Sequence, residues 1–135
     1  MAPELSPAIY FSDSVIREEG TGKLSLIGGF QFFNAGGFPF QGPPFVVTVA
    51  LRNLVENQQI KLGVRIVGPD ESTLADTTGQ MILKKVESSE ILFEFPIPVP
   101  QLNYSRPGTY LAVISLNDQE LGRRPLLVRA VTSTN

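Results

Sequence analysis

The sequence predicts an all-β fold, an antiparallel sandwich of seven or eight strands. Three observations support it: apolar residues alternate with a period of two, turn residues separate the alternating runs, and no long stripe has helical periodicity. Short strands with frequent turns are typical of sandwiches, and a closed barrel is the main alternative. A length of 135 residues fits one domain, so we expect a single sandwich over 1–135, with flexible tails at 1–7 and 132–135.

The first half of the chain contains four expected strands, at 8–18, 23–33, 45–52 and 59–67. A Gly-rich turn at 19–22 separates the first two, and a polar reversal at 53–58 precedes the fourth. The apolar residues that we expect to face the core are Leu24, Leu26, Phe30 and Phe32, then Phe45, Val47, Val49 and Leu51, then Ile60, Leu62, Val64 and Ile66. Each run describes a half-buried strand with one wet face.

The second half contains four more expected strands, at 79–86, 90–99, 109–117 and 120–131. The segment Gly68–Ser72 is a strong turn before them, and Asn117–Glu120 closes a hairpin between the last two. The prolines at 96, 98 and 100 cannot donate hydrogen bonds to a ladder, which predicts that the strand at 90–99 lies at an edge or leaves the sheet early. Pro125 predicts a bulge or a change of sheet in the last strand.

The closing segment from Arg106 to Val128 reads RPGTYLAVISLNDQELGRRPLLV. It resembles the last hairpin of many immunoglobulin-like sandwiches, in which a Pro-Gly turn precedes a tyrosine that anchors a corner. By this resemblance Tyr110 is the corner tyrosine, and the expected fold becomes an immunoglobulin-like sandwich. The motif occurs in unrelated sandwiches, so it implies no function.

A second resemblance covers the opening segment from Asp13 to Phe30, DSVIREEGTGKLSLIGGF, followed by Phe38-Pro39 and by GPD at 68–70. This pattern is similar to a bacterial family of small single-domain proteins of unknown function. Gly29 departs from it, because a bulkier apolar residue is expected there. The resemblance implies a β-sandwich and a bacterial source, and it brings no catalytic residues.

The composition argues against several classes of function. The chain has no His and no Cys, so it lacks the commonest acid/base residue and the main ligands of transition metals. We therefore expect no enzyme, no catalytic residue, no cofactor and no bound zinc, copper or iron. The net charge of −2 predicts no nucleic-acid partner, and the lack of long apolar stretches predicts no membrane partner. The absence of cysteine favours a cytoplasmic location.

Other candidate sites have a simpler structural interpretation. Asp13, Asp70, Asp76 and Asp118 could bind calcium only if the fold gathered their loops. A carbohydrate site would need an exposed aromatic platform, for which Tyr10 and Tyr104 are the available tyrosines. Lys23 and Ser25 are two apart and could form a serine–lysine pair only if buried together. We favour solvated turn and surface positions for all of them, and we identify no small-molecule substrate.

The run from Phe30 to Phe45, FQFFNAGGFPFQGPPF, contains six of the nine phenylalanines. Alternation assigns Phe30 and Phe32 to the core, and Phe45 begins a core strand. The three remaining rings do not fit this alternation: Phe33, Phe38 and Phe40. They either plug the end of the sandwich or form an apolar patch that contacts a partner. We expect Phe40 to pack inward and Phe38 to be exposed.

The leading functional hypothesis is a non-enzymatic protein-interaction module of unknown pathway. Its partner is another protein or a second copy of the chain, with self-association through the Phe-rich loop 33–44. The alternative is a structural subunit of a larger bacterial assembly. Neither the partner nor the pathway follows from the residues.

Overall fold

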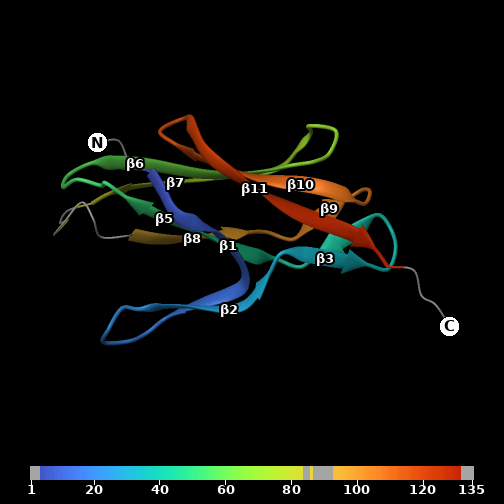
Figure 1. The fold of residues 1–135 in the computed structure, drawn as a ribbon, viewed down its shortest axis with the longest axis horizontal. Helices are drawn as coiled ribbons and strands as arrows, with labels where there is room; N and C mark the ends of the chain where they lie inside the picture. The colour runs from blue at the N-terminus through green and yellow to red at the C-terminus, as the bar shows by residue number, and fades with distance from the viewer. Residues whose placement is uncertain (1–3, 84–85, 87–92, 132–135) are drawn as a thin grey trace.

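Two sheets packed face to face form the body of the molecule (Figure 1), in a computed structural model that describes residues 4–83, 86 and 93–131. Sheet A has the order β2 (Leu24–Phe30), β1 (Glu4–Arg17), β5 (Phe45–Arg52) and β8 (Phe93–Val99). Sheet B has the order β3 (Phe32–Ala35), β11 (Gln119–Ala130), β10 (Gly108–Leu116), β6 (Gln59–Val67) and β7 (Thr73–Ile82). A short pair joins β4 (Phe40–Gly42) to β9 (Leu102–Tyr104).

The predicted all-β sandwich is confirmed. None of the described elements is a helix, so none of the described segments is a helix able to span a membrane. Among the described strands, every pairing is antiparallel except that of β3 with β11, which is parallel. The described strands number eleven rather than seven or eight. One expected strand, 23–33, is divided between the two sheets, and β3, β4 and β9 are too short to show a period of two.

Several strand boundaries differ from expectation. The strand expected at 79–86 begins at Thr73 and ends at Ile82, because β7 is an edge strand whose residues are mostly exposed and therefore need not alternate. Residues 84 and 85 lie outside the described part of the chain, as do residues 90–92 of the strand expected at 90–99. Residues 4–7, expected in a tail at 1–7, lie in β1, where Glu4 pairs with Arg52 of β5. Residues 1–3 and 132–135 lie outside the described residues.

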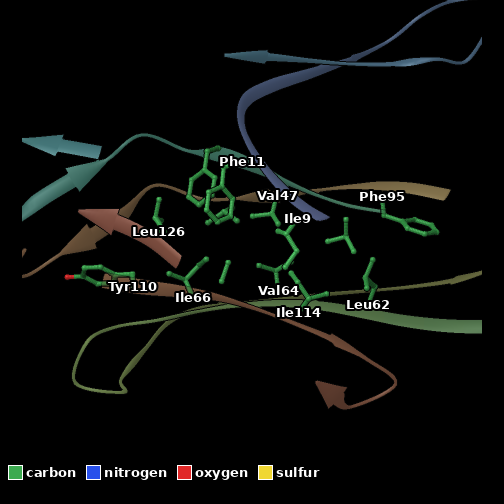
Figure 2. Close-up of a cluster of buried hydrophobic side chains, with 14 of the residues drawn as sticks. Ile9, Phe11, Val47, Leu62, Val64, Ile66, Phe95, Tyr110, Ile114 and Leu126 are labelled. Atoms are coloured by element: carbon green, nitrogen blue, oxygen red, sulfur yellow. The ribbon is translucent and has the colours of Figure 1, made fainter. Parts of the chain in front are cut away.

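The core lies between the facing sides of the two sheets. Figure 2 shows Val47 of β5 and Ile9 of β1 facing Val64 of β6 and Ile114 of β10. These side chains are at most 5% exposed. Burial of each stabilises the fold by roughly 1.5–3 kcal/mol. The alternating residues predicted to face inward on β5 and β6 are all in this core.

The turns follow the chemistry read from the sequence. In the turn 68–72, the Asp70 carboxylate accepts hydrogen bonds from the Ser72 amide at 3.2 Å and the Ser72 hydroxyl at 2.6 Å. Asn117 and Asp118 form a two-residue hairpin turn with φ of 50° and 70°. Positive φ at both positions is the requirement of a type I′ turn, for which Asn and Asp are suited.

The prolines are placed as expected in β8 but not in β11. Pro96 and Pro98 lie in β8, at the edge of sheet A. The last strand does contain a bulge, but at Leu121 rather than at Pro125: Leu121 has no opposite residue, because Ile114 pairs with Gly122 and Ser115 pairs with Glu120. Pro125 lies where one side of β11 is still an open edge, because β3 begins to pair with β11 only at Leu127. A residue without an N–H donor is tolerated at such an edge without a bulge.

Tyr110 forms the corner that the resemblance implies. Its side chain is 1% exposed, and its hydroxyl donates a hydrogen bond of 2.8 Å to the Arg106 carbonyl. The bond ties the start of β10 to the loop that precedes it. This tyrosine corner and the strand order together support the immunoglobulin-like assignment.

Candidate interaction surfaces

The Phe-rich run packs back onto the body and fills one end of the sandwich. Phe33 lies at the centre of this packing, with ring centroids 4.8 Å from Phe30, 5.8 Å from Phe45, 6.0 Å from Phe40 and 5.9 Å from Tyr104. Its side chain is half-buried. The geometry is that of an aromatic cluster at the end of the core, and most of the Phe33 surface is occupied by its own chain.

The prediction that Phe32 faces the core is wrong. The chain leaves sheet A after Phe30 and enters sheet B at Phe32, so the alternation of β2 does not continue into β3. Phe32 is consequently 42% exposed, and the guanidinium of Arg129 lies 3.8 Å from its ring centroid. Arg129 also donates a hydrogen bond from Nε to Oδ1 of Asn34 at 3.1 Å.

The rings of Phe38 and Phe40 are both half-buried and pack against the core. Phe40 pairs with Tyr104 across β4 and β9, with the two rings stacked 6.0 Å apart. Gly42 allows this approach, because a Cβ atom there would lie 2.5 Å from Cε2 of Tyr104. Phe38 is half-buried rather than exposed, which corrects our expectation. Partner contact by Phe33, Phe38 and Phe40 stays a prediction, limited to the part of each ring that solvent reaches.

Tyr104 is fully buried, so it cannot serve as a carbohydrate platform. Its hydroxyl has no hydrogen-bond partner among the described protein groups, and burial raises its pKa well above the usual range. Tyr10, the other tyrosine considered for that role, is 36% exposed.

The acidic residues considered for calcium do not form a site. No group of three His, Cys, Asp or Glu residues suited to a metal occurs in the described ranges. Asp70 is held by Ser72, whose side-chain and backbone hydrogen bonds lower the pKa of its carboxyl. Asp118 accepts a hydrogen bond of 2.9 Å from Lys61 Nζ at the surface. Ser25 is exposed on β2, and Lys23 is exposed immediately before this strand.

A projecting hairpin, which sequence reasoning missed, offers a different surface. β1 pairs with β5 as far as Ser12 and continues beyond it paired with β2 alone. Figure 1 shows this part of the hairpin reaching away from the rest of the ribbon. We call residues 13–29 the β1–β2 arm. It leaves the body at Asp13 and Gly28. Gly28 has a φ of 69°, and a Cβ atom at this residue would collide with the Asp13 carboxylate, so both features favour glycine here.

The β1–β2 arm is apolar on both faces. Residues directly opposite in an antiparallel ladder share a face, so Val15 and Leu26 lie on one side with Leu24. Ile16 and Ile27, 53% and 44% exposed, lie on the other. The half-buried residues of the first side are not among the described side chains that pack against the core. The neighbouring apolar pairs at 15–16 and 26–27 break alternation, and this was the available sequence signal.

Comparison with known families decides what the chain is related to. The sequence profile of a family of unknown function (DUF6941) matches residues 7–129. The chain belongs to this family. Membership confirms the resemblance read from the opening segment and brings no assigned activity. No curated protein matches the chain significantly.

Two solved structures are similar to the chain at low sequence identity. An immunoglobulin-like protein from Pseudomonas aeruginosa is 13% identical, with a TM-score of 0.46, over 96% of this chain and 98% of that chain. The alkylpurine DNA glycosylase AlkC from Pseudomonas fluorescens, bound to DNA containing an abasic site analog, is 12% identical with a TM-score of 0.38. That match covers 74% of this chain and 28% of the glycosylase. At these TM-scores neither match implies an activity, and the fold assignment rests on the chain's own strand order.

Proposed function

We propose that the chain is a non-enzymatic protein-interaction module that uses the β1–β2 arm as its main contact surface. The observation that carries the proposal is the apolar character of both faces of a ribbon with no core beneath it. Val15, Leu24 and Leu26 on one face and Ile16 and Ile27 on the other present aliphatic side chains beyond the body.

The physical argument concerns the stability of an isolated ribbon. A two-stranded hairpin alone is marginally stable in water, and additional strands or a packed face are normally required. A partner that covered one face of the arm would remove Ile16 and Ile27 from solvent and order the ribbon at the same time. The Phe-rich loop 33–44 is a secondary contact in this proposal, because its rings already pack against the core.

The non-enzymatic part of the proposal rests on the sequence. The chain contains no His and no Cys, and its acidic side chains at 70 and 118 are engaged in a turn and in a surface ion pair. Those groups therefore do not converge as an acid and a base must in a catalytic cleft.

The test compares two matched double variants in a pull-down from the native host. The arm variant carries Ile16→Ser and Ile27→Ser, and the control carries Val55→Ser and Ile82→Ser, which are 56% and 59% exposed elsewhere. We expect the arm variant to lose the partners that the wild-type chain and the control retain, with all three proteins melting at similar temperatures.

Equal recovery of partners by both variants would contradict the assignment of the arm. Wild-type chain that co-sediments with large particles would favour the alternative, a structural subunit of a larger bacterial assembly. A discrete soluble complex supports the module.

A further inference from the structure

We propose that the β1–β2 arm binds a second copy of this chain, through antiparallel pairing of the two β2 edges about a twofold axis. The inference rests on the proposed function and names its partner. β2 is the outermost strand of sheet A, so one side of its backbone has no neighbour in the strand order. Pairing of two such edges would convert two isolated two-stranded ribbons into one four-stranded ribbon.

The first argument is the lack of protection at this edge. Natural sheets protect exposed edges with proline, charge or short length. At the other edges, β8 carries Pro96 and Pro98, the unpaired part of β11 carries Arg123–Pro125, β7 carries Asp76, and β3 spans only four residues. β2 reads LSLIGGF over seven residues and contains neither a charge nor a proline.

The second argument is self-complementarity under a twofold axis. Full overlap of two antiparallel β2 strands places the axis at the midpoint of Leu24–Phe30, which is Ile27. No charged side chain of β2 then faces another charge, and Ile27 of one copy lies opposite Ile27 of the other. Like charges directly opposite would have opposed such a pairing.

The third argument is charge complementarity beyond the strand ends. The turn of the arm carries Glu18 and Glu19, both exposed and without an ion pair in the part of the chain that the structure describes. Antiparallel overlap extends this turn past the end of the partner's β2, toward the segment at Gln31 and Phe32. The basic groups there are Arg124, which lines a surface hollow with Gln31, and Arg129, which lies over Phe32. The two carboxylates of this turn, which Arg17 and Lys23 flank, thus lie toward a basic region.

The size of the contact predicts a weak dimer. Seven residues of strand extend about 23 Å at ~3.3 Å per residue. A contact of that length lies at the small end of specific interfaces, below roughly 1,200 Å² of total buried surface. We expect a dissociation constant of micromolar order, weakened by salt because the turn contacts are exposed charges.

The absence of natural cysteine allows a direct test of the pairing. In Ile27→Cys, the twofold pairing places the two Cα atoms about 4.5–5.5 Å apart, within the range of a disulfide. In Ile16→Cys, the substituted residue lies on the same face but on β1, so three strand spacings of ~4.8 Å separate the two copies. We expect mild oxidation to give a disulfide dimer from Ile27→Cys and none from Ile16→Cys. Equal yields from both, or none from Ile27→Cys, would overturn the proposal.

A second measurement uses charge at the same two positions in sedimentation equilibrium. Ile27→Lys should weaken the dimer about tenfold or more, because two lysines then face each other, whereas Ile16→Lys should leave it nearly unchanged. A mixture of Ile27→Lys and Ile27→Glu should restore association. A dimer that survives Ile27→Lys and is lost in Phe38→Ser would place self-association in the Phe-rich loop instead.

The outcomes separate this inference from the proposed function. A wild-type chain that stays monomeric at millimolar concentration overturns the second-copy inference. If the arm double variant still loses a partner in the pull-down, the interaction module survives with a different partner. If it loses none, both proposals fall.

Discussion

At the scale of single residues, two tyrosines in contact show what a buried hydroxyl requires. The rings of Tyr104 and Tyr110 meet edge to face at 5.0 Å, and both side chains are at most 1% exposed. Tyr110 donates its hydroxyl proton to the Arg106 carbonyl, whereas the Tyr104 hydroxyl has no partner among the described groups. A buried polar group without a partner costs free energy, so the two hydroxyls act in opposite directions on stability.

Replacement of each tyrosine by phenylalanine tests this difference. We expect Tyr110→Phe to lower the free energy of unfolding by about 1–3 kcal/mol, because the Arg106 carbonyl loses its donor. We expect Tyr104→Phe to be neutral or stabilising, since it removes an unsatisfied hydroxyl and keeps the ring. Urea unfolding at neutral pH measures both changes, and a larger loss from Tyr104→Phe would contradict the assignment.

At the scale of elements, sequence alternation was informative wherever a strand keeps one buried and one exposed face. β5, β6 and β10 were expected within a residue or two of their actual bounds for this reason. The turns were also readable, because Asp70 and Asn117 act through local backbone geometry. The immunoglobulin-like assignment needed only these regular elements and Tyr110.

The errors at Phe32 and at the β1–β2 arm share a physical cause, which is that alternation says nothing about where a strand changes its sheet or leaves the body. At Gln31 the chain passes from sheet A to sheet B, and the inward phase moves from Phe30 to Phe33. The β1–β2 arm was missed because Leu24 and Leu26 alternate as the residues of a core strand do, although the apolar pairs at 15–16 and 26–27 break that pattern. Which body, if any, lies beneath a strand depends on pairing partners far away in the sequence.

Substitution of Phe32 and of Phe33 tests which of the two side chains faces the core after the chain has passed from sheet A to sheet B. Phe33→Ala should lower the free energy of unfolding by about 3 kcal/mol, the lower end of the range for buried rings, because Phe33 is only half-buried. Phe32→Ala should cost about 1 kcal/mol or less, mainly its contact with Arg129. Thermal and urea unfolding of the two variants give the comparison, and the opposite order would restore the inward assignment of Phe32.

At the scale of the whole molecule, two strands far apart in the sequence close one end of the sandwich. β3 pairs in parallel with the last residues of β11, from Phe32↔Leu127 to Ala35↔Ala130. β3 has no other partner in the strand order, so the C-terminal strand holds the aromatic cluster in place. Such a long-range pairing costs loop-closure entropy that must be met before its contacts contribute to stability.

Truncation of the C-terminus tests this closure. A chain ending at Leu126 loses the buried Val128 and every backbone partner of β3, while Phe33 loses the strand that positions it. Burial of one valine and several ladder hydrogen bonds together give on the order of 4 kcal/mol, a large share of the 5–15 kcal/mol typical of a domain. We therefore expect a sharp fall in melting temperature and loss of the near-ultraviolet aromatic signal. A chain ending at Val131 keeps all of these pairings and should melt like the full chain. A truncation at Leu126 that retained both properties would show that the aromatic cluster is held by sheet A and by β9 without the C-terminal strand.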